Sequence, residues 1–247
     1  MHMRVDFHSH ILPDMDDGCK DLKDSLKQVK LAEEYKINFI AATSHFYPHV
    51  ETVESFLSRR EKSFRLLKGS LSREAPEILL GAEVLLYPGM DKMPDIELLC
   101  LEGTKVLLLE MPFFKEWDLS YIKSAIGIRD KKDLIVVLAH GERYRPKEIK
   151  KLTDEGFLMQ INTNSMKNIG LCRRVRDYVK NEYVTAFGSD LHKIDNSYKR
   201  YDSVMKKFGK EAVSIQQKAF QLIKPQAGQG AFSGRRSNGR NEGVGTK

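Results

Sequence analysis

Seven short apolar segments alternate with segments of helical periodicity along this chain, and this alternation most constrains its fold. The segments are rich in Leu, Ile and Val, which is typical of parallel strands that are covered on both faces. Their repeat of roughly 30 residues is that of a βα unit in a closed barrel. We therefore predict an α/β protein with a distorted (β/α)7 barrel similar to a TIM barrel. The predicted strands are Arg4–His10, Asn38–His45, Ile78–Val84, Lys105–Met111, Leu134–His140, Phe157–Thr163 and Tyr183–Asp190.

Helices are predicted between these strands from the spacing of apolar residues and from the residues that bound them. Apolar stripes at helical spacing begin at Leu22 and at Val53, and the second stripe ends at Gly69. Pro146 and Gly156 are the N-terminal proline and C-terminal glycine that often bound a helix. Further helices are predicted over Ser165–Lys180, Tyr198–Phe208 and Lys210–Lys224.

The chain is predicted to contain one folded domain and a tail. A length of 247 residues lies within the range of single α/β barrels, and we assign residues 1–224 to the barrel. Residues 225–247 contain six glycines and almost no apolar side chains. Such a segment cannot bury enough apolar surface to order itself, so we expect this tail to be disordered.

The charge and hydropathy of the chain argue against a nucleic-acid partner and against membrane insertion. The formal net charge is +7, of which residues 226–247 supply +3 through four basic side chains and one acidic one. The remaining basic residues are interspersed with acidic ones, which is typical of a solvated surface and not of a nucleic-acid groove. No apolar run approaches the roughly 20 residues that span a bilayer, and no signal-peptide pattern follows Met1. We therefore expect a cytoplasmic protein without membrane insertion or bound nucleic acid.

The three cysteines, Cys19, Cys100 and Cys172, indicate reduced thiols because they are odd in number and widely spaced. A cysteine-based phosphatase needs an arginine six positions after its nucleophilic cysteine. The corresponding positions hold Ser25, Val106 and Tyr178, so this chemistry is excluded.

A residue that could bind a metal ion stands near the end of almost every predicted strand. Side chains of a strand alternate between its faces, so His8 and His10 point to the same side. Glu83 and Glu110 each follow apolar residues, where a buried carboxylate needs a compensating partner. The C-terminal ends of the strands of a parallel barrel lie on one face, which carries the active site in such enzymes. We therefore predict a metal site at this face, built from His8, His10, His45, Glu83, Glu110, His140, Asp190 and His192.

We do not assign the other polar residues near this face to the metal site. Asn162 and Asn164 could bind a substrate or cap the end of their strand. His49 follows a proline in a loop, and we expect it at the surface. We expect Asp14 and Asp16 to be solvated loop carboxylates.

Several motifs in this order resemble those of the PHP (polymerase and histidinol phosphatase) superfamily, and the resemblance covers about residues 4–222. Within this superfamily, the chain looks like the manganese-dependent tyrosine-protein phosphatases of bacterial capsular and exopolysaccharide loci. The motif Asp16-Asp17-Gly18 and the motif that begins at Ala139 narrow the resemblance to these enzymes. The motifs are Asp6-Phe7-His8-Ser9-His10, Asp16-Asp17-Gly18, Thr43-Ser44-His45, Gly81-Ala82-Glu83, Glu110, Ala139-His140-Gly141-Glu142-Arg143-Tyr144 and Gly188-Ser189-Asp190-Leu191-His192.

This resemblance implies a site for three metal ions that are held by imidazoles and carboxylates. Asp17 enters the ligand set through the resemblance alone, because it lies in a loop. Manganese is the metal of these relatives, and iron or zinc would also suit such ligands. The implied sets are His8, His10, Glu83 and Asp190 for one ion; Glu83, Glu110 and His140 for a second; and Asp17, His45 and His192 for a third.

The implied reaction is hydrolysis of protein phosphotyrosine by direct attack of water that the metal ions activate. The phenolate of tyrosine, with a pKa of about 10, leaves more readily than an alkoxide. Arg143 is the residue we expect to bind the phosphoryl oxygens, because its planar guanidinium matches a phosphate. The alternative for Arg143 is an ion pair with a carboxylate at a strand end. The candidate catalytic residues are Arg143, His45, Asp190 and His192.

The resemblance also implies a partner, a tyrosine kinase of polysaccharide assembly, and it leaves an oligomer possible. Two positions depart from the family pattern and bear on substrate choice. Phe46 stands where relatives have a second histidine, and Ser197 stands where they have an arginine that Lys199 or Arg200 could replace. Two other functions stay open: another PHP phosphoesterase such as a histidinol phosphatase, or a binding module that metal ions only stabilise.

Overall fold

The computed structural model describes residues 3–113, 116–193 and 196–224 of the chain. The strands in these residues pair in parallel throughout. They are β1 (Val5–Ser9), β2 (Phe39–Ala42), β3 (His45–Phe46), β4 (Glu77–Leu80), β5 (Glu83–Leu85), β6 (Val106–Glu110), β7 (Ile135–Leu138), β8 (Leu158–Asn162) and β9 (Ala186–Gly188).

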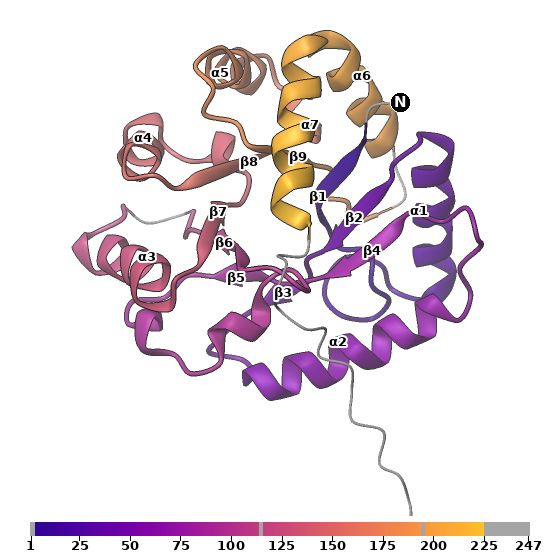
Figure 1. The fold of residues 1–247 in the computed structure, drawn as a ribbon, viewed down its shortest axis with the longest axis horizontal. Coiled ribbons are helices and arrows are strands. Elements are labelled where there is room, and N and C mark those ends of the chain that lie inside the picture. The colour runs from indigo at the N-terminus through magenta and orange to yellow at the C-terminus, as the bar shows by residue number, and fades with distance from the viewer. Residues whose placement is uncertain (1–2, 114–115, 194–195, 225–247) are drawn as a thin grey trace, which may run out of the picture.

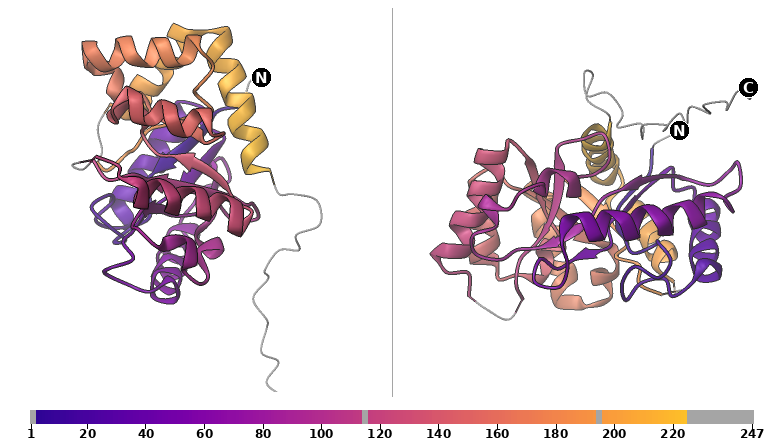
Figure 2. Two further views of the ribbon diagram at one scale, coloured as in Figure 1. Left: turned by 90° about the vertical axis from the view of Figure 1, so that its left-hand side faces the viewer. Right: turned by 90° about the horizontal axis from the view of Figure 1, so that it is seen from below.

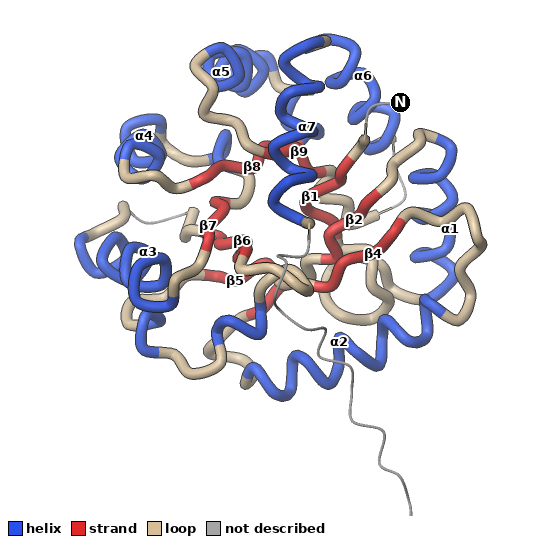
Figure 3. Tube along the Cα trace, in the orientation of Figure 1, coloured by secondary structure: helices blue, strands red, loops and turns tan. Residues whose placement is uncertain are grey.

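Helices connect these strands and lie around the outside of the sheet (Figure 3). The α-helices are α1 (Leu22–Glu34), α2 (Val53–Lys68), α3 (Leu119–Lys132), α4 (Pro146–Asp154), α5 (Ile169–Lys180), α6 (Ser197–Phe208) and α7 (Lys210–Ile223). Short 3-10 helices cover Met90–Lys92, Ile96–Leu99, Gly141–Arg143 and Thr163–Lys167.

The strands form a curled parallel sheet with the helices outside it, which confirms the predicted α/β barrel class (Figure 1). One part has the strand order β1-β2-β4, and the other has β3-β5-β6-β7-β8-β9. The β1 edge of the first part meets the β9 edge of the second. There the Asp190 backbone N–H, after β9, donates to the His8 carbonyl of β1 at 2.8 Å. The residues that follow β1 and β9 are therefore held side by side.

The second and third predicted strands each break in two. Asn38–His45 becomes β2 and β3, and Ile78–Val84 becomes β4 and β5. The breaks carry the chain from one part of the sheet to the other, because β2 pairs with β4 whereas β3 pairs with β5. Gly81 lies at one break, where a Cβ atom would stand 2.5 Å from Leu101 Cδ2. The absence of a side chain there lets the chain pass close to Leu101.

Two apolar clusters hold the fold together. The larger one packs the outer helices against the strands. The smaller one joins alternate residues of the strands, such as Val106 and Leu108 of β6, to Ala219 and Ile223 of α7. Helix α7 lies across one end of the barrel, on the side where the described chain begins (Figure 2). The C-terminal ends of the strands face the other way.

The helices begin where side chains can accept hydrogen bonds from the first free backbone N–H groups. Asp21, Thr52 and Asp118 cap α1, α2 and α3 in this way. The helix predicted from Ser165 begins later, at Ile169, because Asn168 caps it and a 3-10 helix occupies the preceding residues. Helix α4 begins at Pro146 as predicted.

None of the helices in the described ranges is long and apolar enough to cross a membrane. The three cysteines are free thiols, as predicted. The tail expected over residues 225–247 lies outside the described residues.

Candidate metal centre

All nine predicted metal-binding side chains come together at the C-terminal ends of the strands. Four are on strands: His8 on β1, His45 on β3, Glu83 on β5 and Glu110 on β6. The others follow strands or lie in a loop: His10 after β1, Asp17 in the β1–α1 loop, His140 after β7, and Asp190 and His192 after β9.

Glu83 lies in the middle of the group and contacts four imidazoles. Its Oε2 atom is 3.1 Å from His8 Nε2 and 3.0 Å from His45 Nδ1. Its Oε1 atom is 2.7 Å from His140 Nε2. Burial alone would raise the pKa of Glu83, but the charge of His8 and hydrogen bonds from the other imidazoles hold it well below its usual range. Glu83 is therefore a buried carboxylate in its ionised form.

His8, His10 and Asp190 form a buried group beside Glu83. The Nε2 atoms of His8 and His10 are 3.1 Å apart, which confirms that the two imidazoles point to one place. Asp190 Oδ1 is 3.4 Å from His10 Nε2 and 3.7 Å from His8 Nε2. Two nitrogen atoms and a carboxylate oxygen this close suit a cation between them.

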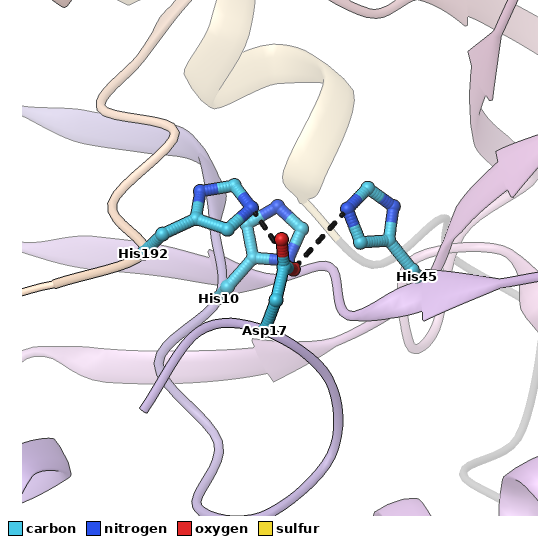
Figure 4. A group of neighbouring side chains, drawn as sticks. All are labelled: His10, Asp17, His45 and His192. Atoms are coloured by element: carbon cyan, nitrogen blue, oxygen red, sulfur yellow. Dashed lines mark ion pairs between the residues drawn. The ribbon is translucent and has the colours of Figure 1, made fainter. Parts of the chain in front are cut away.

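A second group gathers His10, Asp17, His45 and His192 near the surface (Figure 4). Asp17 Oδ1 is 3.6 Å from His45 Nε2 and 3.3 Å from His192 Nε2. The Asp17 side chain is 73% exposed. Asp17 thus faces the same place as the histidines at the strand ends, although the residue pattern alone did not indicate it.

A third group contains His45, Glu83 and Glu110, and it carries an excess of negative charge. Burial, and then the charge of Glu83, raise the pKa of Glu110 to about 7. A divalent cation would reverse the effect of the neighbouring charge and compensate the burial. The donor set of the three groups, imidazole nitrogens with carboxylate oxygens, therefore fits divalent metal ions.

The backbone turns sharply at two of these residues. His140 has a φ of 35° and Asp190 has a φ of 49°, in the left-handed region that non-glycine residues rarely adopt. Each is the second residue after the end of its strand, β7 for His140 and β9 for Asp190. Strain of this kind persists where the surrounding structure requires it, and it is common at functional sites.

The prediction that Asp16 is a solvated loop carboxylate is wrong. Its side chain is only 6% exposed, and its Oδ2 atom accepts hydrogen bonds from His10 Nδ1 at 2.8 Å and from the His45 backbone N–H at 2.9 Å. Burial would raise the pKa of Asp16, but the contact with His10 lowers it overall. Metal-binding histidines commonly donate their other ring N–H to a carboxylate in this way. Asp14 is exposed, as predicted.

The family of the chain follows from a comparison with known proteins. The model of the family described as "Capsular polysaccharide synthesis, CpsB/CapC" matches residues 4–220. The chain belongs to the CpsB/CapC family. It is 32% identical to the tyrosine-protein phosphatase YwqE of Bacillus subtilis over 172 residues, which are 67% of this chain and 66% of that protein.

Longer matches support the same family. The tyrosine-protein phosphatase CpsB of Streptococcus agalactiae is 28% identical over 228 residues, which cover 84% of this chain and 92% of CpsB. A solved structure described with YwqE of Bacillus subtilis and CpsB of Streptococcus pneumoniae has a TM-score of 0.72 and 27% identity. It covers 90% of this chain and 95% of its own, and its title describes unique metal-dependent tyrosine phosphatases.

In this CpsB/CapC protein, Arg143 lies at the rim of the group and takes part in an ion pair. Its Nη2 atom is 2.7 Å from Asp190 Oδ2, and its side chain is 40% exposed. The alternative interpretation, an ion pair with a strand-end carboxylate, is thus the arrangement seen here. Arg143 is thus paired with one of the candidate ligands and open to solvent at the same time.

The two departures from the family pattern have different surroundings. Phe46 is fully buried and packs edge-on against Phe56, with ring centroids 5.4 Å apart. Arg200 hydrogen-bonds Asn164 and, at 3.1 Å, Ser197 Oγ. Asn164 in turn donates to the Ser189 carbonyl at 2.9 Å, next to Asp190. Arg200 is therefore connected through Asn164 to the segment that carries the candidate ligand Asp190, whereas Lys199 is exposed.

Aromatic rings flank the group on two sides. The Phe113 ring centroid is 4.9 Å from that of His140, and the Arg143 guanidinium is 5.9 Å from the Phe113 ring. Tyr47 stacks on His45 with ring centroids 5.1 Å apart. Phe113 is 39% exposed although it is large and apolar. We call Phe113 and Tyr47 the aromatic rim.

Proposed function

We propose that this protein is a metal-dependent phosphatase that hydrolyses phosphotyrosine in proteins. The observation that carries the proposal is the convergence of five histidines and three further carboxylates around Glu83, in a chain of the CpsB/CapC family. The relatives named above are tyrosine-protein phosphatases, and the solved ones are described as metal-dependent.

The proposed ligands divide among three ions, and we propose manganese as the metal, with iron and zinc as alternatives. Metal ions at this place would neutralise phosphoryl charge and lower the pKa of the attacking water. The proposed sets are His8, His10, Glu83 and Asp190 for the first ion; Glu83, Glu110 and His140 for the second; and Asp17, His45 and His192 for the third.

The residues around the ligands would bind and orient the phosphate ester. Arg143 would exchange part of its contact with Asp190 for the non-bridging phosphoryl oxygens, because its fork of N–H groups matches them. The aromatic rim would hold the phenyl ring of the substrate by stacking. An alkyl phosphate has no ring for Phe113 to contact. The rim therefore favours phosphotyrosine over phosphoserine.

The proposed partner is a phosphorylated tyrosine kinase of polysaccharide assembly. The family description supports the polysaccharide part of this proposal, and the kinase is inferred from the family resemblance. The free thiols of Cys19, Cys100 and Cys172 support a cytoplasmic location, where thiols stay reduced.

The test is hydrolysis of a phosphotyrosine peptide by purified protein before and after treatment with EDTA, with metal content measured on the same sample. We expect EDTA to abolish turnover and Mn²⁺ to restore it. We expect His140→Ala to lose activity, because it removes an imidazole that lies 2.7 Å from Glu83. His49→Ala is the matched control for metal content, because His49 is exposed and lies outside the ligand groups. Full activity of the metal-stripped protein would refute the proposal.

Two substrates separate the alternative functions. A histidinol phosphatase would turn over histidinol phosphate faster than the phosphotyrosine peptide, and we expect the reverse. A binding module would retain its metal ions and hydrolyse neither ester.

A further inference from the structure

A buried glutamine lies beneath the metal-binding side chains, and the proposed reaction does not use it. Gln160 is on β8 and is fully buried. Its Oε1 atom is 2.8 Å from the His140 backbone nitrogen and 3.1 Å from His8 Nδ1. Its Nε2 atom is 2.8 Å from Asn162 Oδ1, and Asn162 Nδ2 is 2.6 Å from Asp190 Oδ2. Gln160 and Asn162 thus form a chain of amides that connects three of the proposed ligands.

One backbone N–H group sets the direction of every hydrogen bond in this amide chain. The His140 N–H can only donate, so the Gln160 atom that faces it must be the carbonyl oxygen. The Gln160 NH₂ group must then donate to Asn162 Oδ1. The Asn162 NH₂ group is left to donate to Asp190. The orientation of both amides therefore follows from the backbone and not from the metal site.

The same direction fixes the tautomer of His8. Because Gln160 Oε1 can only accept, His8 Nδ1 must carry the hydrogen in their 3.1 Å contact. The Nε2 atom of His8, which is 3.1 Å from Glu83 Oε2, then presents its lone pair to the metal-binding group when the ring is neutral. Asp16 accepts from Nδ1 of His10 and has the same effect on that ring.

We propose that Gln160 and Asn162 are positioning residues that prepare His8 and Asp190 as ligands of the same metal ion. The inference rests on the metal centre proposed above, but not on the reaction, because its test is metal binding. The lack of space around the chain supports it. A Cβ atom on Gly188 would stand 2.6 Å from Gln160 Nε2, so the glutamine packs directly against the β9 backbone and cannot shift toward it.

The test measures the affinity of the purified protein for Mn²⁺ by competition with a chelating indicator. Gln160→Met keeps the length of the side chain and removes both hydrogen-bonding atoms. Loss of a residue that orients a metal ligand typically weakens metal affinity by about 10- to 100-fold, and we expect a change of this size. Gln216→Met is the matched control. Gln216 is a buried amide that accepts from the Val5 backbone at 2.6 Å and donates to the Tyr201 hydroxyl at 2.8 Å, away from the metal-binding side chains.

A second variant decides the matter if Gln160→Met does not fold. Asn162→Leu keeps the approximate size of the side chain and removes both the acceptor for Gln160 and the NH₂ donor to Asp190, so we expect the same weakening. Wild-type affinity in either folded variant, or an equal loss in Gln216→Met, would overturn the inference. A wild-type protein that binds none of the proposed metals, Mn²⁺, Fe²⁺ and Zn²⁺, would overturn it together with the metal centre. A wild-type protein that binds Mn²⁺, and a Gln160→Met protein that binds it weakly, would support it even if no phosphotyrosine were hydrolysed.

Discussion

Asp16→Asn removes a buried charge behind His10 and keeps the size of the side chain. The carboxylate accepts three hydrogen bonds: from His10 Nδ1 at 2.8 Å, from the His45 N–H at 2.9 Å and from the Gly18 N–H at 2.9 Å. An amide offers an acceptor on one side and a donor on the other, so at least one of these three donors loses its acceptor. Hydrogen bonds to charged groups contribute about 1.5–3 kcal/mol, so we expect the free energy of unfolding of the metal-free protein to fall by about 2 kcal/mol.

The same substitution should also weaken metal binding, because His10 would lose the partner that orients its ring. Loss of such a partner costs about 10- to 100-fold in metal affinity. The assays are urea unfolding of the metal-free protein and competition with a chelating indicator for Mn²⁺. Asp14→Asn is the matched control. Asp14 lies in the same loop, is exposed and has a φ of 55°, which asparagine adopts readily.

The reasoning about Asp16 would be refuted by an Asp16→Asn protein that binds Mn²⁺ as tightly as the wild type. An equal loss in Asp14→Asn would also refute it, because the effect would then come from the charge of the loop and not from the contact with His10.

Three further predictions concern packing, pH and substrate choice. Gly188→Ala should lower the free energy of unfolding by about 1–3 kcal/mol, because its Cβ would lie 2.6 Å from Gln160 Nε2 and from His8 Cβ. Gly69→Ala, whose Cβ would lie 3.5 Å from the nearest atom, should change it by less than about 0.5 kcal/mol in urea unfolding. Burial raises the pKa of Glu142 from 4.5 to about 7, so the folded protein binds a proton that the unfolded chain has lost between these values. Glu142 should therefore contribute a fall of about 3 kcal/mol in the free energy of unfolding as the pH rises through this window, and Glu142→Gln should remove that contribution while the similar one of Glu110 stays. Phe113→Leu should lower kcat/KM for a phosphotyrosine peptide by about 10-fold, because a stacking contact contributes about 0.5–1.5 kcal/mol. The kcat/KM for a phosphoserine peptide should stay within a factor of about 2. Equal losses for both esters would contradict an aryl-binding role.

The barrel could be predicted from the sequence because the strands are short, apolar and separated by helices of similar length. Strand β6 over Val106–Glu110 lies within the predicted Lys105–Met111. The breaks within Asn38–His45 and Ile78–Val84 could not be predicted, because small or apolar residues continue through them. Only the pairing of β2 with β4 and of β3 with β5 shows where each half belongs.

The convergence of the strand-end candidates could be predicted because parallel strands end at one face, and because Glu83 and Glu110 follow apolar residues where a carboxylate is costly without a partner. Asp17 lies in a loop without periodicity and needed the family resemblance. The roles of Asp16 and Gln160 could not be predicted for another reason. Each of them contacts the Nδ1 atom of a histidine, Asp16 that of His10 and Gln160 that of His8. Such a contact depends on how the strands are arranged in space, and the spacing of residues along the chain does not indicate it.

The left-handed backbone at His140 makes stability and activity compete at one position. Glycine adopts that conformation freely, whereas other residues lose about 1–2 kcal/mol there. A descendant of this chain that no longer needed its metal ions would therefore gain from a glycine at position 140, and the change would remove a ligand while the barrel stayed intact. Such a substitution would mark an inactive member of this family whose folded state is more stable because the metal-binding side chain at position 140 has been given up.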